Sequence, residues 1–116
     1  AQPAGGRGGQ NQGAQRAAAR ALLVVVVARL SEHPKVPHVE QRLSAGCAAH
    51  GLLLAAEALG FAGIWRTGDP AFDREVMDGL GLGAQEEITG FLYLGSRDGQ
   101  AKPLPQLEPE EFVSTW

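Results

Sequence analysis

A short segment near the middle of the chain combines residue types that suit a ligand-binding loop. Ile64, Trp65, Arg66, Thr67 and Gly68 follow one another in the sequence. A guanidinium binds phosphate through paired hydrogen bonds, a threonine hydroxyl adds a donor, and an indole can cover a flat ring. We therefore predict a binding loop at this segment. The alternative is an exposed arginine beside a tryptophan of the core.

Two further pairs of ionisable residues have helical spacing. Cys47 and His50 are three residues apart and could act as a nucleophilic pair or bind metal. His50 and Glu57 are seven apart and could act as acid and base. Metal sites need three or four ligands, and the other histidines, His33 and His38, lie in a proline-rich segment. We therefore predict neither a metal site nor a catalytic residue, but a buried cysteine, a hydrogen-bonded histidine and a polar helix edge.

The composition limits the classes of protein to which the chain can belong. The chain has 116 residues, a net charge of -3 and one cysteine. This length suits one domain, the negative charge argues against nucleic-acid binding, and a lone cysteine is typical of a reducing compartment. The longest uninterrupted apolar run, residues 21–28, is far shorter than the roughly 20 residues of a membrane-spanning helix. We therefore predict a cytoplasmic protein with no nucleic-acid or membrane partner.

The chain divides into a tail and a folded region. Residues 1–15 are mostly Gly, Gln and Ala and lack an apolar period, so they cannot offset the entropy cost of ordering and we predict a disordered tail. Residues 16–116 form the folded region. Its last segment, the arm of residues 103–116, carries Phe112 and Trp116, whose rings need a surface to bury against. We expect that surface on another subunit.

Hydrophobic patterning predicts alternating strands and helices. The continuous β-branched run of residues 22–27 is typical of a strand buried on both faces. Asp73 can cap a short helix, and Gly60 can end a long one. The glycines of the apolar run 88–95, Gly90 and Gly95, indicate a close approach by backbone or ligand. Together the patterns predict strands over 22–27, 61–65 and 88–95 and helices over 39–59 and 73–80, an order typical of a layered α/β or α+β domain.

The long predicted helix is apolar around nearly its whole circumference. Between Ser44 and Leu59, the ionisable side chains are Cys47, His50 and Glu57. A helix of this kind must be buried on nearly every side, but a domain of this size buries only about two-thirds of its unfolded surface. We therefore infer that another chain, or a segment outside this sequence, packs beside the helix.

Several ordered segments carry a family resemblance. They include residues 43–49, 52–61 and 63–68, continue through 73–76, 80–82 and 88–95, and end at Phe112 and Val113. Upstream, residues 18–30 and 33–37 fit the same pattern. Over about residues 16–116, the chain resembles the C-terminal half of the nitroreductase family, in its small, compact subgroup. Members of this family are FMN-dependent NAD(P)H oxidoreductases.

The resemblance implies a fold and an assembly. It implies an α+β fold with a mixed β-sheet flanked by helices, and a long buried helix in a homodimer interface that holds two flavin sites. The arm would reach over the partner. The family's N-terminal half carries a flavin-contacting Arg-Arg-Ser type motif, for which this chain has no counterpart. We therefore expect the partner to be a second copy or a chain that carries the complementary N-terminal half.

The resemblance also implies a chemistry. A hydride passes from NAD(P)H through FMN to a nitroaromatic or quinone-like acceptor, and the chain need supply no catalytic acid, base or nucleophile. Trp65, Arg66 and Thr67 would contact FMN, with Arg66 toward the phosphate. The nicotinamide nucleotide would contact Ala55, Ala56, Glu57, Ala58, Leu59 and Gly60. The alternative is a non-catalytic nitroreductase-like half domain that is a pairing subunit or a fragment.

Overall fold

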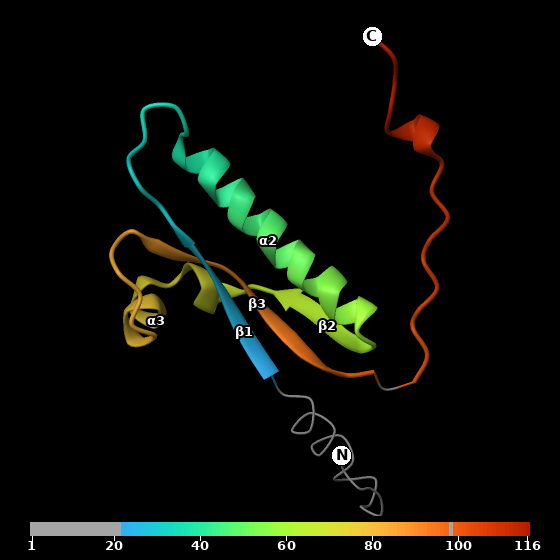
Figure 1. Ribbon diagram of the computed structural model, residues 1–116, viewed down its shortest axis with the longest axis horizontal. Helices are drawn as coiled ribbons and strands as arrows, with labels where there is room; N and C mark the ends of the chain where they lie inside the picture. Colours follow the sequence, from blue (N-terminus) through green and yellow to red (C-terminus); the bar gives the residue numbers. More distant parts are fainter. Residues whose placement is uncertain (1–21, 98) are drawn as a thin grey trace, which may run out of the picture.

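The computed structural model describes residues 22–97 and 99–116, so the tail predicted for residues 1–15 lies outside the described residues. The elements follow the predicted order of strand, long helix, strand, short helix and strand (Figure 1). Their bounds are β1 Leu22–Arg29, α2 His38–Ala58, β2 Phe61–Arg66, the 3-10 turn η1 Asp69–Phe72, α3 Arg74–Gly79, β3 Glu86–Ser96 and the 3-10 turn η2 Pro109–Glu111.

The three strands form one sheet in the order β1-β3-β2, with β3 in the centre. Both pairings are antiparallel, so the described strands do not form the mixed sheet that the resemblance implied, although the predicted α+β class is confirmed. The register of β1 against β3 shifts where Val26 faces Gly90 and Val27 faces Ile88. The extra residue in this step is Thr89, which forms a β-bulge.

The strand predicted to be buried on both faces lies instead at an edge of the described sheet. Leu22 of β1 is 60% exposed and Leu23 is 47% exposed, while the fully buried Leu92 lies on the central strand β3. The sequence does not reveal this edge position, because a uniform β-branched run is typical both of a central strand and of an edge strand that other residues cover.

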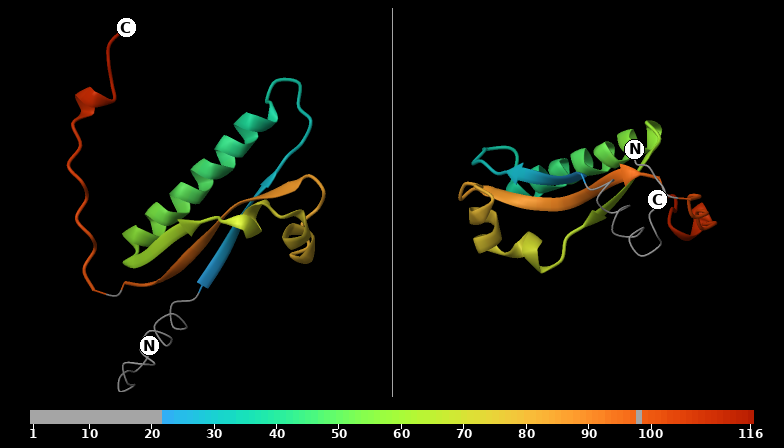
Figure 2. Two further views of the ribbon diagram at one scale, coloured as in Figure 1. Left: turned by 180° about the vertical axis from the view of Figure 1, so that it is seen from behind. Right: turned by 90° about the horizontal axis from the view of Figure 1, so that it is seen from below.

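Helix α2 packs along one face of the sheet, and η1 and α3 pack on the other (Figure 2). Small side chains on α2, the buried Ala49 and Ala56, allow the helix to approach the strands closely. On the opposite face, Ala71, Met77 and Ile88 form a small buried cluster. The core is therefore divided by the sheet into two thin layers.

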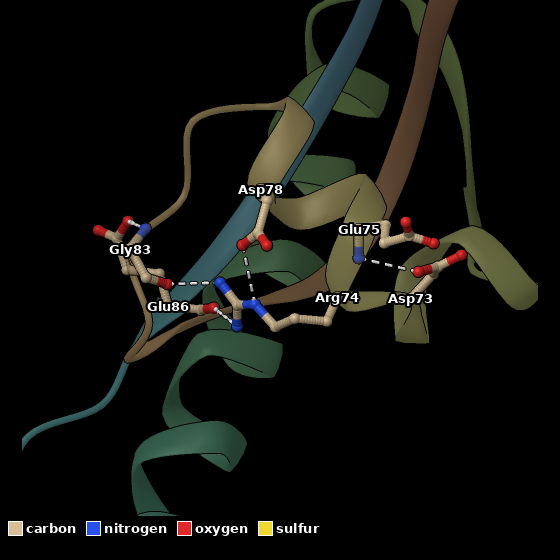
Figure 3. A network of polar contacts seen from close by, with 6 residues as sticks. All are labelled: Asp73, Arg74, Glu75, Asp78, Gly83 and Glu86. Atoms are coloured by element: carbon tan, nitrogen blue, oxygen red, sulfur yellow. Dashed lines mark hydrogen bonds and ion pairs between the residues drawn. The ribbon is translucent and has the colours of Figure 1, made fainter.

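Polar side chains fix the loops that lead into both helices. The Gln41 amide accepts a hydrogen bond from the Ser31 backbone and donates to the carbonyls of Ser31 and Val36, each at 2.9 Å. Asp73 caps α3 as predicted, because its carboxylate accepts from the Glu75 backbone N–H at 2.9 Å. Arg74 then holds the turn between α3 and β3 through three acceptors (Figure 3).

Several large apolar side chains of the long helix and of the arm are exposed in this chain. Leu43 and Leu54 of α2 are 65% and 58% exposed. As expected for a domain of this size, the chain by itself does not bury the helix on every side. The arm runs away from the sheet (Figure 1), and Phe112 and Trp116 are both exposed. These apolar surfaces fit the inference that further protein packs beside the helix.

Candidate functional site

Trp65 of the predicted binding loop packs between the sheet and α2 instead of standing free at the surface. It belongs to β2, pairs with Leu92 across the sheet, and is half-buried. Its indole lies in a slot whose two sides are Gly90 of β3 and Gly46 of α2. A Cβ atom at Gly90 would lie 2.6 Å from the indole Cδ1 and 3.0 Å from Cε2. The glycines of this strand were predicted to allow a close approach by backbone or ligand; at Gly90 the group that approaches is instead a side chain of this chain.

Arg66 and Thr67 follow Trp65 at the end of β2, and both are exposed. Arg66 pairs with Phe91. Phe91 packs against the buried cluster of Ala71, Met77 and Ile88. Because successive side chains of a strand point to opposite faces, Arg66 projects from the face opposite to that of Trp65. The structure thus brings Arg66 and Thr67 together at one sheet end but does not bring the indole to the guanidinium.

The Arg66 guanidinium is available for a ligand. Within residues 22–97 and 99–116, it makes neither a hydrogen bond nor an ion pair. Gly68 turns the chain after Thr67 with a φ of 74°, a backbone conformation that favours glycine. An exposed guanidinium beside a hydroxyl on a tight turn is a donor set that fits a phosphate group.

The helical Cys47, His50 and Glu57 do not form a site. Cys47 is exposed, so the prediction of a buried cysteine is wrong for this chain. Glu57 pairs with Arg97 at 2.6 Å instead of with His50. In the part of the chain that the structure describes, no three His, Cys, Asp or Glu residues are grouped so that they could hold a metal ion.

The other two histidines, His33 before α2 and His38 at its first position, have local roles. The Nδ1 atom of His33 accepts hydrogen bonds from the backbone of Lys35 and Val36 at 3.0 and 3.2 Å. The Nε2 atom of His38 lies 3.2 Å from a carboxylate oxygen of Glu32. Both interactions shape the segment between β1 and α2, which explains these histidines without a ligand.

Sequence reasoning missed an ion pair that joins α2 to β3. The Nε and Nη2 atoms of Arg42 donate to the two carboxylate oxygens of Glu87 at 2.9 and 3.0 Å. These hydrogen bonds lower the pKa of Glu87 against a smaller opposing effect of burial. The pair borders a mostly apolar cleft of about 520 Å³, which Phe72, Met77 and Thr89 also line. The partners are 45 residues apart, so no local pattern could have revealed the pair.

A comparison with protein families decides the classification. The profile described as "Nitroreductase family" matches residues 4–96. The chain belongs to the nitroreductase family. Over 94 residues it is 46% identical to YdjA of Escherichia coli (strain K12), an NAD(P)H nitroreductase by name. The matched region covers 80% of this chain and 51% of YdjA. Over 104 residues it is 38% identical to a Haemophilus influenzae protein also named as an NAD(P)H nitroreductase. This match covers 87% of this chain and 56% of that protein.

Solved structures agree with this classification. The nitroreductase-like family protein of Bacillus cereus superposes with a TM-score of 0.68 at 18% identity, over 80% of this chain and 49% of that chain. A likeness at this identity supports the fold alone. The chain spans about half the length of the curated nitroreductases that it matches.

The second predicted contact segment of this nitroreductase chain lies at the C-terminal end of α2. Ala56 is buried there, whereas Leu59 is 75% exposed. Gly60 ends the helix with a φ of 91°. The segment presents an apolar surface, and its one charged residue, Glu57, already binds Arg97. In the described residues, no helix is long and apolar enough to cross a membrane.

Proposed function

We propose that this chain supplies part of the site of an FMN-dependent NAD(P)H oxidoreductase of the nitroreductase type. The reaction oxidises NAD(P)H and passes the hydride through FMN to a nitroaromatic or quinone-like acceptor, which gains two electrons. The observation that carries the proposal is the exposed Arg66 and Thr67 at the end of β2, in a chain of this family. The chemistry that bound FMN supplies is the uptake and release of that hydride.

The residues of the chain would bind and orient the cofactor. Arg66 would bind the FMN phosphate through its guanidinium, and Thr67 would add a hydroxyl donor. Trp65 would hold the end of β2 from inside the fold, which modifies its predicted role as a direct flavin contact. These roles require no acid, base or nucleophile from the chain.

We propose that the nicotinamide nucleotide lies against the C-terminal end of α2. The exposed side chains of Ala55, Ala58 and Leu59 offer it an apolar surface. The Glu57–Arg97 pair would fix the end of the helix relative to β3. The small acceptor would bind after the nucleotide has left.

We propose that the partner is a second copy of the chain or a chain that carries the complementary half of the domain. The support is the exposed apolar surface of α2, where Val39, Leu43 and Leu54 are each more than half exposed. The arm carries a second exposed apolar surface, with Phe112 and Trp116. A cytoplasmic location stays a prediction.

The test is flavin retention by the full 116-residue chain. The chain is incubated with FMN and desalted, alone and with the N-terminal half of E. coli YdjA, and the flavin absorbance is measured. Arg66→Ala should lower the affinity for FMN about tenfold or more, because a charged hydrogen-bond partner of the phosphate is lost. Lys102→Ala removes an exposed cation just before the arm and should change nothing. Equal retention by Arg66→Ala and the parent chain would refute the phosphate assignment.

A second function, a non-catalytic pairing subunit, is favoured by the same exposed apolar residues of α2 and the arm. It predicts association with no retained flavin and no oxidation of NAD(P)H. Flavin that stays with the chain or with its complemented form, and that NAD(P)H bleaches, would exclude this second function. A colourless complex would exclude the first.

A further inference from the structure

The indole slot of Trp65 depends on the absence of a side chain at Gly90. A Cβ at this position would lie within 3.0 Å of two indole carbon atoms and closer still to Nε1. The opposite side of the slot is less tight, since a Cβ at Gly46 would lie 3.8 Å from the indole. Gly90 is buried and does not have a positive φ. The requirement for glycine is therefore steric and concerns Trp65.

We propose that Gly90 is a positioning residue for the loop of Arg66 and Thr67, and that it acts through Trp65. This inference rests on the proposed function, because it assigns Gly90 to the same FMN site. Trp65 is the next-to-last residue of β2, and Arg66 pairs with Phe91, the residue after Gly90. A side chain at Gly90 displaces the indole from α2 and β3, and this displacement shifts the adjoining Arg66 and Thr67.

The β-bulge next to Gly90 strengthens the argument. Thr89 is the extra residue between the pairs Val26–Gly90 and Val27–Ile88. A bulge bends its strand and redirects the side chains beside it. Here it lies directly before the residue that receives the indole, on the strand that aligns the end of β2. The regular pairing of β2 with β3 ends at Arg66 and Phe91, directly beside Gly90 and the bulge.

Gly63 provides a matched control in the same strand as Trp65. A Cβ at Gly63 would lie 2.7 Å from a methyl group of Leu94 and 2.8 Å from one of Leu53. Gly63→Ala therefore overpacks the same face of the sheet, two residues before Trp65. Its neighbours are the ends of flexible leucines instead of a rigid indole. The two alanine variants thus separate general overpacking from displacement of Trp65.

The experiment uses the full chain with Trp116→Phe, which leaves Trp65 as its only tryptophan. Gly90→Ala should move the Trp65 emission toward that of an exposed indole and raise amide exchange at residues 66–68 by about tenfold, because the overpacked slot opens. It should weaken FMN binding, measured on the chain or its complemented form, by a similar factor. Gly63→Ala should change neither the exchange at residues 66–68 nor FMN binding.

A compensating variant completes the test. Trp65→Phe shortens the ring that meets the new Cβ, so adding it to Gly90→Ala should restore slow exchange at residues 66–68. Unchanged exchange in Gly90→Ala, or equal effects of Gly63→Ala and Gly90→Ala, would overturn the inference. Failure of the proposed function is recognised separately, because Arg66→Ala would then leave FMN binding unchanged while the exchange data stand.

Discussion

Arg42 and Glu87 form a two-point ion pair that joins the first turns of α2 to the bulged start of β3. Both donor–acceptor distances are 3.0 Å or less. The two side chains are partly exposed, at 50% and 36%, so water screens their attraction. The pair links α2 to β3 directly. It does so at the border of the cleft that Thr89 also lines, where few buried side chains join the two elements.

Glu87→Gln should make stability less sensitive to acid. The folded-state pKa of Glu87 is lowered below its ordinary value of 4.5 by hydrogen bonding to Arg42. A carboxylate of this kind stabilises the fold above its unfolded pKa, and the contribution is lost as pH falls through the lower folded-state pKa. Urea unfolding at neutral pH should show a small loss of stability in Glu87→Gln, and the difference from the parent chain should shrink in acid. A difference that grows in acid would contradict this account.

Leu92→Ala should cause the largest loss of stability among single leucine truncations in the sheet. Leu92 is fully buried on the central strand, between Val24 of β1 and Trp65 of β2. A buried Leu→Ala change costs about 2–5 kcal/mol, which the urea midpoint would report. Leu104→Ala, on the exposed arm, is the control and should stay within about 0.5 kcal/mol. Similar losses in both variants would mean that the sheet does not form the core.

Arg74→Ala should loosen the turn between α3 and β3. The guanidinium donates to Asp78 at 3.1 Å and to the carbonyls of Glu86 and Gly83 at 3.1 and 2.6 Å. Loss of these bonds should cost about 1 kcal/mol and speed amide exchange at residues 83–86. Asp78→Asn, which keeps both carbonyl contacts, should have a smaller effect. Equal exchange in the two variants would show that the carbonyl contacts do not hold the turn.

Leu54→Glu should prevent association without unfolding the chain. The side chain is 58% exposed on α2, so a charge costs little in the monomer, but it would be desolvated without a partner in an apolar interface. Sedimentation of the chain, alone and with the complementary half, measures the effect. Ser44→Glu, at an exposed polar position of the same helix, is the control. Unchanged association in Leu54→Glu would remove α2 from the interface.

The order of elements could be predicted from the sequence because each element has a strong local signal. The long apolar run of α2, the Asp73 cap and the positive-φ glycines after both helices are local signals. The position of β1 in the sheet, the pairing of Arg42 with Glu87 and the slot for Trp65 depend on residues far apart in the chain. Local patterns carry no information about such neighbours, so these features became visible only in the structure.

In the candidate site too, local features could be predicted and long-range contacts could not. The composition of residues 64–68 predicted a binding loop, and the exposed Arg66 and Thr67 fit that prediction. Strand alternation, applied to Trp65 and Arg66, would already have separated their side chains onto opposite faces. The signal that could have identified Gly90 was a glycine in the interior of an apolar strand, although its partner, an indole from a neighbouring strand, had no signature in the sequence.

The position of β1 at the edge of the described sheet has a practical consequence. An edge strand offers a row of unpaired backbone donors and acceptors, and a β-branched run such as residues 22–27 is the kind of segment that recruits identical strands. The described part of the chain therefore carries a template for aggregation. Its soluble yield should depend more on co-expression with whatever protein covers this edge than on any substitution that strengthens the core.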